Sequence, residues 1–274
     1  MDGFTQEING VVITFFSTAS AVGKTLISIN MAAELARQGK KVCLIDFDLQ
    51  FGDVSNYLQL MPRFSAYDLQ QAMNRQGSVM RPEEFLTPYT YQNVLFYVLA
   101  APQKLEEAYN IEEDKAIDMV RQLQKKFDYV LVDTTSTFSK LNLELLKLST
   151  IVSFLGIVDF IPTIKNMKIG METLKKLKFD MQKIRLVLNR SNAKTHISID
   201  DVEHLLGEQF YHILPNDFQA ASQSIKDGVP LVLRSGGREL GEALRDLVAR
   251  YTNRVYEDET AEAVPESWLA RIFG

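Results

Sequence analysis

Short apolar runs alternate along most of the chain with longer stretches in which apolar residues recur every three or four positions. The short runs predict β-strands, and the longer stretches predict amphipathic helices. Strands are expected at residues 11–16, 41–47, 94–99, 128–133, 151–158, 184–188 and 210–214. Helices are expected at residues 24–38, 66–75, 83–86, 111–127, 141–148, 162–178, 200–206, 218–226 and 239–256. Most of residues 77–92, which include Pro82 and Pro88, is expected to be irregular.

The strand at residues 41–47 shows what kind of sheet to expect. Val42-Cys43-Leu44-Ile45 is an uninterrupted apolar run, as in a parallel strand buried on both faces. Together with the alternation of strands and helices, it predicts an α/β fold with a doubly wound, mainly parallel sheet and helices on both faces. This domain is expected to cover residues 1–256. The acidic residues 257–266 are expected to form a flexible tether to a short tail, 267–274.

Composition narrows the class of protein. Of 274 residues, 46% are hydrophobic and 24% charged, as in ordinary soluble globular proteins. The net charge of −5 argues against non-specific nucleic-acid binding. The single cysteine, Cys43, excludes an internal disulfide and fits a reducing cytoplasm. No signal peptide and no apolar run of about 18 residues is seen. The histidines lack metal-ligand spacing and are interpreted as surface or loop residues.

Candidate chemistry begins at the first predicted strand. Its apolar run enters a turn of small residues that closes on Gly23-Lys24-Thr25, directly before a predicted helix. This pattern is typical of a phosphate-binding loop, in which backbone N–H groups surround a polyphosphate, the lysine neutralises it and the threonine holds Mg²⁺. The usual pattern has glycine five positions before Gly23, where this chain has Thr18.

Acidic residues follow three of the predicted strands. Asp46 and Asp48 end the second, Asp133 ends the strand at residues 128–133, and Asp159 follows residues 151–158. Ligands of such sheets bind at the carboxyl ends of the strands, and a nucleotide site needs carboxylates for Mg²⁺ and for the attacking water. Asp46, Asp48 and Asp133 are therefore candidate site residues, whereas Asp159 is interpreted as a helix cap or a surface residue.

Three segments, residues 23–25, 41–50 and 128–134, resemble the three nucleotide motifs of the ParA/MinD class of P-loop ATPases. Residues 186–190, which read Leu-Val-Leu-Asn-Arg, resemble the strand whose asparagine contacts adenine in that class. Residues 213–217, which read Ile-Leu-Pro-Asn-Asp, resemble the next base-contacting segment. The resemblance extends over about residues 10–250.

The resemblance implies that the cofactors are ATP and Mg²⁺. It implies that Lys24 contacts the β- and γ-phosphates and that Thr25 binds Mg²⁺. Asp46 and Asp133 would help to hold Mg²⁺. Asp48 would position the attacking water, and Asp48 and Lys24 are therefore the candidate catalytic residues. The phosphates would be cradled by the N–H groups of Ala21, Val22, Gly23, Lys24 and Thr25.

The resemblance also implies a base site and a dimer. Asn189 would pair with adenine beside Arg190, and Pro215 and Asp217 would border the base. Proteins of this class form homodimers through the nucleotide face, and a homodimer is expected here.

The loop departs from the class at its first half. The class typically carries Lys-Gly-Gly-x-Gly-Lys-Thr, whose first lysine reaches the partner's phosphates, but here that lysine is Ala19 and the glycines are Ser20 and Ala21. Losing such a trans-acting cation costs about 10³–10⁵ in rate. ATP binding is expected to survive, and hydrolysis to ADP and phosphate is expected to be slow or absent. Residues 134–136, Thr-Thr-Ser, stand where the class often has prolines, so the second switch is also expected to differ.

Within the class, residues 49–54, 99–102 and 161–166 look like the TadZ/CpaE branch, the localisation ATPases of Flp/Tad type IV pilus assembly. This implies a positioning protein that recruits pilus or secretion machinery at a cell pole or at the inner face of the membrane. That branch usually has an N-terminal receiver-like domain. The chain begins almost at the first strand, so it is either a short form or a form from which that domain was trimmed.

The tail is the second candidate interaction site. Trp268, Leu269, Ile272 and Phe273 fall on one side of a short helix, and the tail resembles the membrane-targeting helix that ends MinD proteins. Membrane or partner docking and a disordered or body-packed end remain alternatives. The alternative functions are a MinD-like cell-division or flagellar positioning ATPase and a non-hydrolysing pseudo-ATPase scaffold. A DNA-partitioning ATPase is disfavoured by the net charge, and nucleic acid is not an expected partner.

Overall fold

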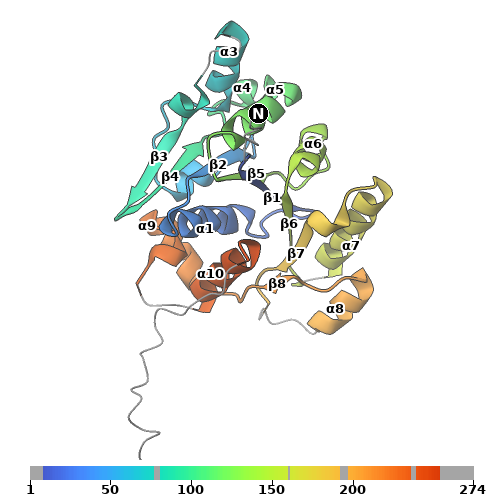
Figure 1. Ribbon diagram of the computed structural model, residues 1–274. Coiled ribbons are helices and arrows are strands. Elements are labelled where there is room, and N and C mark those ends of the chain that lie inside the picture. Colours follow the sequence, from blue (N-terminus) through green and yellow to red (C-terminus); the bar gives the residue numbers. More distant parts are fainter. Residues whose placement is uncertain (1–8, 77–80, 160, 192–196, 236–238, 254–274) are drawn as a thin grey trace, which may run out of the picture.

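A computed structural model of the chain describes residues 9–76, 81–159, 161–191, 197–235 and 239–253. The described residues form a sheet of eight strands in the order β3-β4-β2-β5-β1-β6-β7-β8 (Figure 1). All neighbouring strands are parallel except β3 and β4. The strands are β1 (Val11–Ser17), β2 (Val42–Phe47), β3 (Thr87–Tyr91), β4 (Val94–Leu99), β5 (Tyr129–Thr134), β6 (Ile151–Gly156), β7 (Ile184–Leu188) and β8 (His212–Ile213).

Helices cover both faces of this sheet, so the predicted fold class is confirmed (Figure 1). The α-helices are α1 (Lys24–Arg37), α2 (Val54–Tyr57), α3 (Ala66–Gln76), α4 (Leu105–Tyr109), α5 (Glu113–Gln124), α6 (Lys140–Leu148), α7 (Ile161–Lys176), α8 (Ile199–Leu206), α9 (Phe218–Asp227) and α10 (Glu239–Tyr251). Short 3₁₀ helices are η2 (Pro82–Phe85), η3 (Met181–Lys183) and η4 (Leu231–Leu233). In the described ranges no helix is both long and apolar enough to cross a membrane.

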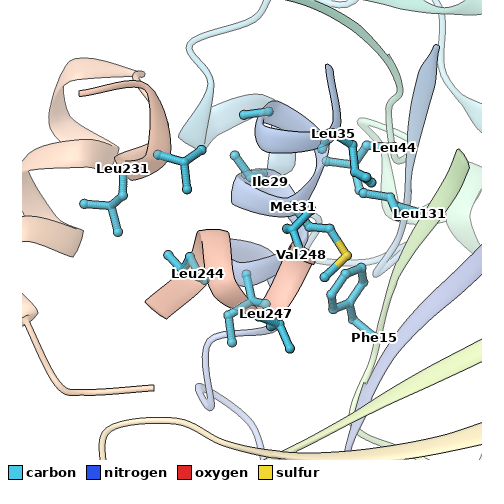
Figure 2. Close-up of a cluster of buried hydrophobic side chains, with 14 of the residues drawn as sticks. Phe15, Ile29, Met31, Leu35, Leu44, Leu131, Leu231, Leu244, Leu247 and Val248 are labelled. Atoms are coloured by element: carbon cyan, nitrogen blue, oxygen red, sulfur yellow. The ribbon is translucent and has the colours of Figure 1, made fainter. Parts of the chain in front are cut away.

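Alternate side chains of the central strands supply the two faces of the core. Phe15 of β1 packs toward α1 and α10, whereas its neighbour Phe16 packs among residues of α7 and α8. Figure 2 shows Phe15, Leu44 and Leu131 of the sheet beside side chains of α1 and α10. This alternation follows from the two-residue period of a strand. It fixes helix α1, and therefore the loop in front of it, against the centre of the sheet.

Three sequence predictions need correction. Residues 87–91 are not irregular, because β3 pairs antiparallel with β4 and places Pro88 on an edge strand, where a missing N–H is tolerated. Helix α4 lies in a segment for which no helix was predicted. His212 is not a surface residue: it is buried, and its Nε2 lies 2.8 Å from the carbonyl oxygen of Ala243. The predicted tether and tail lie outside the described residues, and the domain boundaries stay a prediction.

Candidate nucleotide site

The candidate site lies at the carboxyl ends of β1, β2 and β5. Strand β5 stands between the other two, and the register places Asp133 of β5 beside both Phe15 of β1 and Asp46 of β2. The chain leaves β1 through residues 18–23 and enters α1 at Lys24. The predicted loop and two of the predicted acids therefore meet at one edge of the sheet, as the topology of open α/β sheets requires.

The second half of the loop has a backbone shape that depends on glycine. Gly23 has φ 97°, and a Cβ atom there would lie 2.5 Å from Nδ2 of Asn189. Asn189 Nδ2 donates to the carbonyl oxygen of Val22 at 2.9 Å, and Arg190 Nη2 donates to the carbonyl oxygen of Ala21 at 3.0 Å. The two residues predicted to contact the base thus lie against the phosphate loop, although they are far from it in sequence.

Lys24 is buried at the start of α1, and its partners are hydroxyl groups. Its Nζ donates to Oγ of Ser136 at 2.8 Å and to Oγ of Ser17 at 3.4 Å. In the described part of the chain no carboxylate forms an ion pair with it. Burial lowers the pKa of Lys24, and the nearby charges of Asp133 and Asp48 oppose that shift. The ammonium is therefore close to acids but directly bonded to neutral groups.

Asp133 has a partner at only one of its two carboxylate oxygens. Its Oδ2 accepts a hydrogen bond of 2.6 Å from Oγ1 of Thr25, whereas its Oδ1 is buried without a partner. Burial raises the pKa of Asp133 to about 6, while the Thr25 hydrogen bond and the charge of Lys24 act in the opposite direction. Buried polar atoms in native proteins rarely stay unpaired, so Oδ1 is a candidate position for contact with a further group.

Asp46 differs from Asp133 because backbone groups hold both of its oxygens. Oδ1 accepts from the N–H of Asp48 at 3.2 Å, and Oδ2 accepts from the N–H of Val54 at 3.1 Å. Burial and the neighbouring charge of Asp133 raise the pKa of Asp46. These bonds fix the turn that follows β2, and they hold Asp48 at the edge of the site.

Pro215 and Asp217, which are predicted to border the base, lie between β8 and α9. Pro215 is buried, and Asp217 Oδ1 accepts from the N–H of Ala220 at 2.8 Å and so caps α9. The N–H of Ser191 donates to the carbonyl oxygen of Leu214 at 3.0 Å, which joins the two predicted base segments. Asp159 lies 4.0 Å from Arg190 Nη1.

Comparison with known proteins identifies the family. A sequence model of the CobQ/CobB/MinD/ParA nucleotide binding domain matches residues 13–231, which is more than half of the chain. The chain belongs to this family. The septum site-determining protein MinD of Thermotoga maritima is 27% identical over 238 residues, covering 84% of this chain and 83% of the relative.

Solved structures of the MinD/ParA family share the fold. A ParA family ATPase from Chlorobium tepidum has a TM-score of 0.79 at 19% identity, covering 87% of this chain and 98% of that one. MinD from Pyrococcus horikoshii, solved with Mg-ADP, has a TM-score of 0.75 at 18% identity, covering 88% of this chain and 96% of that one. At these identities the likeness concerns the fold, and the roles of individual residues rest on the geometry described above.

The donor set of this family member fits Mg²⁺. Magnesium takes oxygen ligands and is commonly held by one or two protein groups together with nucleotide phosphates. Thr25 Oγ1 and the unpaired Oδ1 of Asp133 supply such oxygens beside Lys24. In the described ranges no group of three or more His, Cys, Asp or Glu side chains is arranged to hold a metal by protein ligands alone. The chemistry therefore suits an ion that arrives with a polyphosphate.

Three residues of the site are absent from the sequence predictions. Ser17 and Ser136 contact Lys24, and Asn142 of α6 holds the segment that carries Ser136. The run of hydroxyl residues at 134–136 is visible in the sequence as a departure from the family. Its contact with Lys24 spans 112 positions, however, and only the pairing of β1 with β5 brings the two segments together.

Proposed function

We propose that this MinD/ParA family member is an ATP-binding positioning protein that forms a homodimer around ATP and Mg²⁺ and turns ATP over slowly. We place it in the TadZ/CpaE branch, where it would recruit Flp/Tad pilus or secretion machinery at the cytoplasmic face of the membrane or at a cell pole. The proposal separates into a nucleotide site, a slow reaction and a localisation role, and each part has its own support.

The nucleotide site is supported by two charged side chains beside the loop that lack partners of opposite charge or a full set of hydrogen bonds. Lys24 is buried with hydroxyl partners only, and Asp133 keeps one buried oxygen unpaired. A Mg²⁺–polyphosphate offers an anion to the first and a cation to the second. Burial strengthens both interactions, because charges attract more strongly where water is excluded.

The first half of the loop supports slow turnover. Position 19 is alanine, and its carbonyl oxygen accepts hydrogen bonds from Ser17 and Ser136, both at 2.8 Å. A methyl side chain offers no cation to the phosphates of a second subunit. Lys24 and Thr25 of the same subunit remain, so ATP would be held better than it would be split.

The localisation role rests on the resemblance of residues 49–54, 99–102 and 161–166 to the TadZ/CpaE branch and on the tail with Trp268, Leu269, Ile272 and Phe273. One short amphipathic helix binds lipid weakly. An ATP-held dimer would present two such tails and could couple membrane attachment to ATP through avidity.

Titration calorimetry of the purified chain with ATP and Mg²⁺ tests the root of the proposal. We expect saturable binding at millimolar ATP or below, and light scattering should show a dimer with ATP but not without it. Absence of binding at millimolar ATP would overturn the proposal. The variant Ala19→Lys should hydrolyse ATP at least about tenfold faster than the wild type, because it restores the missing cation.

A MinD-like role in cell division is a second candidate, favoured by the match to MinD of Thermotoga maritima. The two roles differ in their partners and in their deletion phenotypes. Loss of pili with normal septum placement supports the first, and misplaced septa with normal pili support the second. A third possibility, a scaffold that ignores ATP, predicts that Lys24→Ala keeps its partners and its position in the cell.

A further inference from the structure

Ser136 contacts the phosphate loop, residues 18–25, although no sequence motif predicts this. Its hydroxyl accepts from Lys24 Nζ at 2.8 Å, donates to the carbonyl oxygen of Ala19 at 2.8 Å and lies 2.9 Å from Oγ of Ser17. A hydroxyl group has one donor and two acceptor sites. The bonds to Ala19 and Lys24 use its one hydrogen and one of its two acceptor sites; because Ser17 also has a single hydrogen, the contact between the two hydroxyls is a hydrogen bond only when one of them turns away from Ala19.

The backbone on both sides of Ser136 is held in place. Oγ1 of Thr134 donates to the carbonyl oxygen of Phe15 at 2.7 Å, which ties the segment to β1. Nδ2 of Asn142, a buried residue of α6, lies 2.7 Å from the carbonyl oxygen of Thr137 and 2.8 Å from Oγ1 of Thr135. Ser136 is therefore presented to Lys24 from a supported position, which is the arrangement expected of a preorganised site.

The chemical character of this contact matters because acids are close by. The charges of Asp133 and Asp48 act on Lys24, yet no described carboxylate lies within ion-pairing distance of its ammonium. If Lys24 turned to Asp133, the two charges would compensate each other, and an incoming phosphate would have to break a charged hydrogen bond. A hydrogen bond in which both partners are charged is stronger than one between an ammonium and an uncharged hydroxyl.

We propose that Ser136 is a positioning residue of the phosphate loop: it holds the Lys24 ammonium toward the loop and away from Asp133, so that nucleotide phosphates meet a cation that is not already paired. The same hydroxyl fixes the carbonyl of Ala19 and thus the first half of the loop. This inference rests on the proposed binding of ATP at this site, which it deepens by naming a residue that prepares the site.

The test compares the dissociation constant of ATP with Mg²⁺ for the wild type, Ser136→Ala and Ser136→Thr by titration calorimetry. We expect Ser136→Ala to bind about five- to tenfold more weakly, because Lys24 would pair with an acid, and Ser136→Thr to stay within about twofold of the wild type. Thr137→Val is the matched control, since Thr137 is exposed on the same segment and its hydroxyl contacts Thr135 rather than Lys24. It should also stay within about twofold.

A double-mutant cycle with Lys24→Ala separates positioning from general loosening of the loop. Binding of a fluorescent ATP analogue should change by less than about twofold when Ser136→Ala is added to the Lys24→Ala background. An equal loss in both backgrounds, or wild-type affinity of Ser136→Ala alone, would overturn the inference while leaving ATP binding intact. If the wild type itself binds no ATP, the proposed function fails. Thermal unfolding of every variant confirms that it is folded.

Discussion

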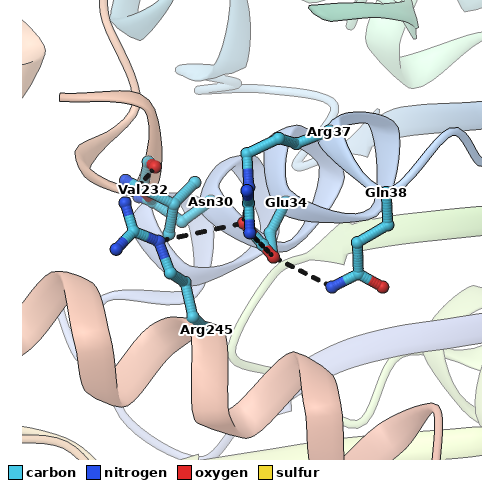
Figure 3. A network of polar contacts seen from close by, with 6 residues as sticks. All are labelled: Asn30, Glu34, Arg37, Gln38, Val232 and Arg245. Carbon is cyan, nitrogen blue, oxygen red and sulfur yellow. Dashed lines mark hydrogen bonds and ion pairs between the residues drawn. The ribbon is translucent and has the colours of Figure 1, made fainter. Parts of the chain in front are cut away.

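The two ends of helix α1 both bury charged groups, but they complete them differently. Near its C-terminus, Glu34 is 1% exposed and accepts hydrogen bonds from Arg37 Nε at 2.8 Å, Arg37 Nη2 at 2.9 Å and Gln38 Nε2 at 2.9 Å (Figure 3). Arg245 of α10 adds a more distant cation, with Nε 4.0 Å from Oε2 of Glu34. Both oxygens of this buried carboxylate have protein partners.

At the N-terminus of the same helix the charges are left incomplete. Lys24 has only hydroxyl partners, and Asp133 has one buried oxygen without any. A satisfied buried network makes packing specific, whereas a partly satisfied one lowers the stability of the empty protein. Oε1 of Gln38 and Nε of Arg245 are also buried without a hydrogen-bond partner, so the two ends differ in their carboxylates: Glu34 has partners at both oxygens, whereas Asp133 keeps one buried oxygen unpaired.

The largest expected effect is a loss of stability when the buried carboxylate of Glu34 is removed. Replacing Glu34 by Ala leaves Arg37 and Arg245 without their shared carboxylate and should lower the free energy of unfolding by about 3 kcal/mol. The dissociation constant of ATP, measured below the unfolding transition, should stay within about twofold of the wild type, because the cluster is structural. Chemical denaturation measures the loss.

The matched control for that variant is Glu144→Ala. Glu144 pairs with Lys147 on the surface of α6, and both side chains are exposed. Exposed pairs contribute about 0–1 kcal/mol, so a small change is expected. A large loss of ATP affinity in Glu34→Ala, with normal stability, would contradict the division between the two ends of α1.

The next effect is on ATP affinity when Lys24 is replaced. Lys24→Ala should weaken ATP binding about 100-fold, or about 2.7 kcal/mol, because the phosphates lose their buried cation. Its unfolding free energy should change by less than about 1 kcal/mol, since two hydrogen bonds to hydroxyls are lost while the cost of burying an ammonium is removed. Calorimetry and denaturation of the same samples check both values. Lys147→Ala, at an exposed position, is the control.

The sequence predicts the residues whose signal is local, but it does not predict contacts between residues that are far apart in the chain. Gly23, Lys24 and Thr25 are adjacent in sequence, so local spacing was enough to predict them. Asp133 was predicted because it ends an apolar strand, a local signal as well. The hydroxyl of Ser136 was not predicted, because its role comes from a contact made across the sheet, and no periodicity reports on that contact.

The fold shows the same division. The central strands were predicted because they are continuously apolar, as a strand covered by helices must be. Strand β3 was missed because it lies at the edge, alternates in exposure and contains Pro88. Its pairing depends on β4, where the ring of Phe96 packs 4.8 Å from that of Tyr89, and such cross-strand packing is not encoded in one segment.

A smaller effect concerns pH. The pKa of Asp133 is raised to about 6 in the folded protein, so its protonated form is favoured by folding. The resulting stability is present below about pH 4 and is lost as the pH rises through about 6. Relative to Asp133→Asn, the wild type without nucleotide should therefore lose about 1 kcal/mol of unfolding free energy between pH 5 and pH 7.5.

Denaturation of both proteins at the two pH values measures that difference. The variant keeps an oxygen that can accept the Thr25 hydrogen bond but carries no charge, so the Mg²⁺-dependent part of its ATP binding should disappear. A difference that is constant with pH would mean that Asp133 does not change its ionisation between pH 5 and pH 7.5, which would contradict a folded-state pKa of about 6.

The smallest expected effect separates residues that contact the phosphates from residues that contact the base. Asn189→Ala removes the hydrogen bond to the carbonyl of Val22 and the predicted contact with adenine. ATP binding should weaken about threefold, and the preference for ATP over GTP should fall by a similar factor, whereas pyrophosphate binding should stay within about twofold of the wild type. Competition titrations measure all three ligands, with the exposed Asn74→Ala as control. An equal loss for pyrophosphate would assign Asn189 to support of the loop, because a residue that only reads the base cannot change the affinity for a ligand without one.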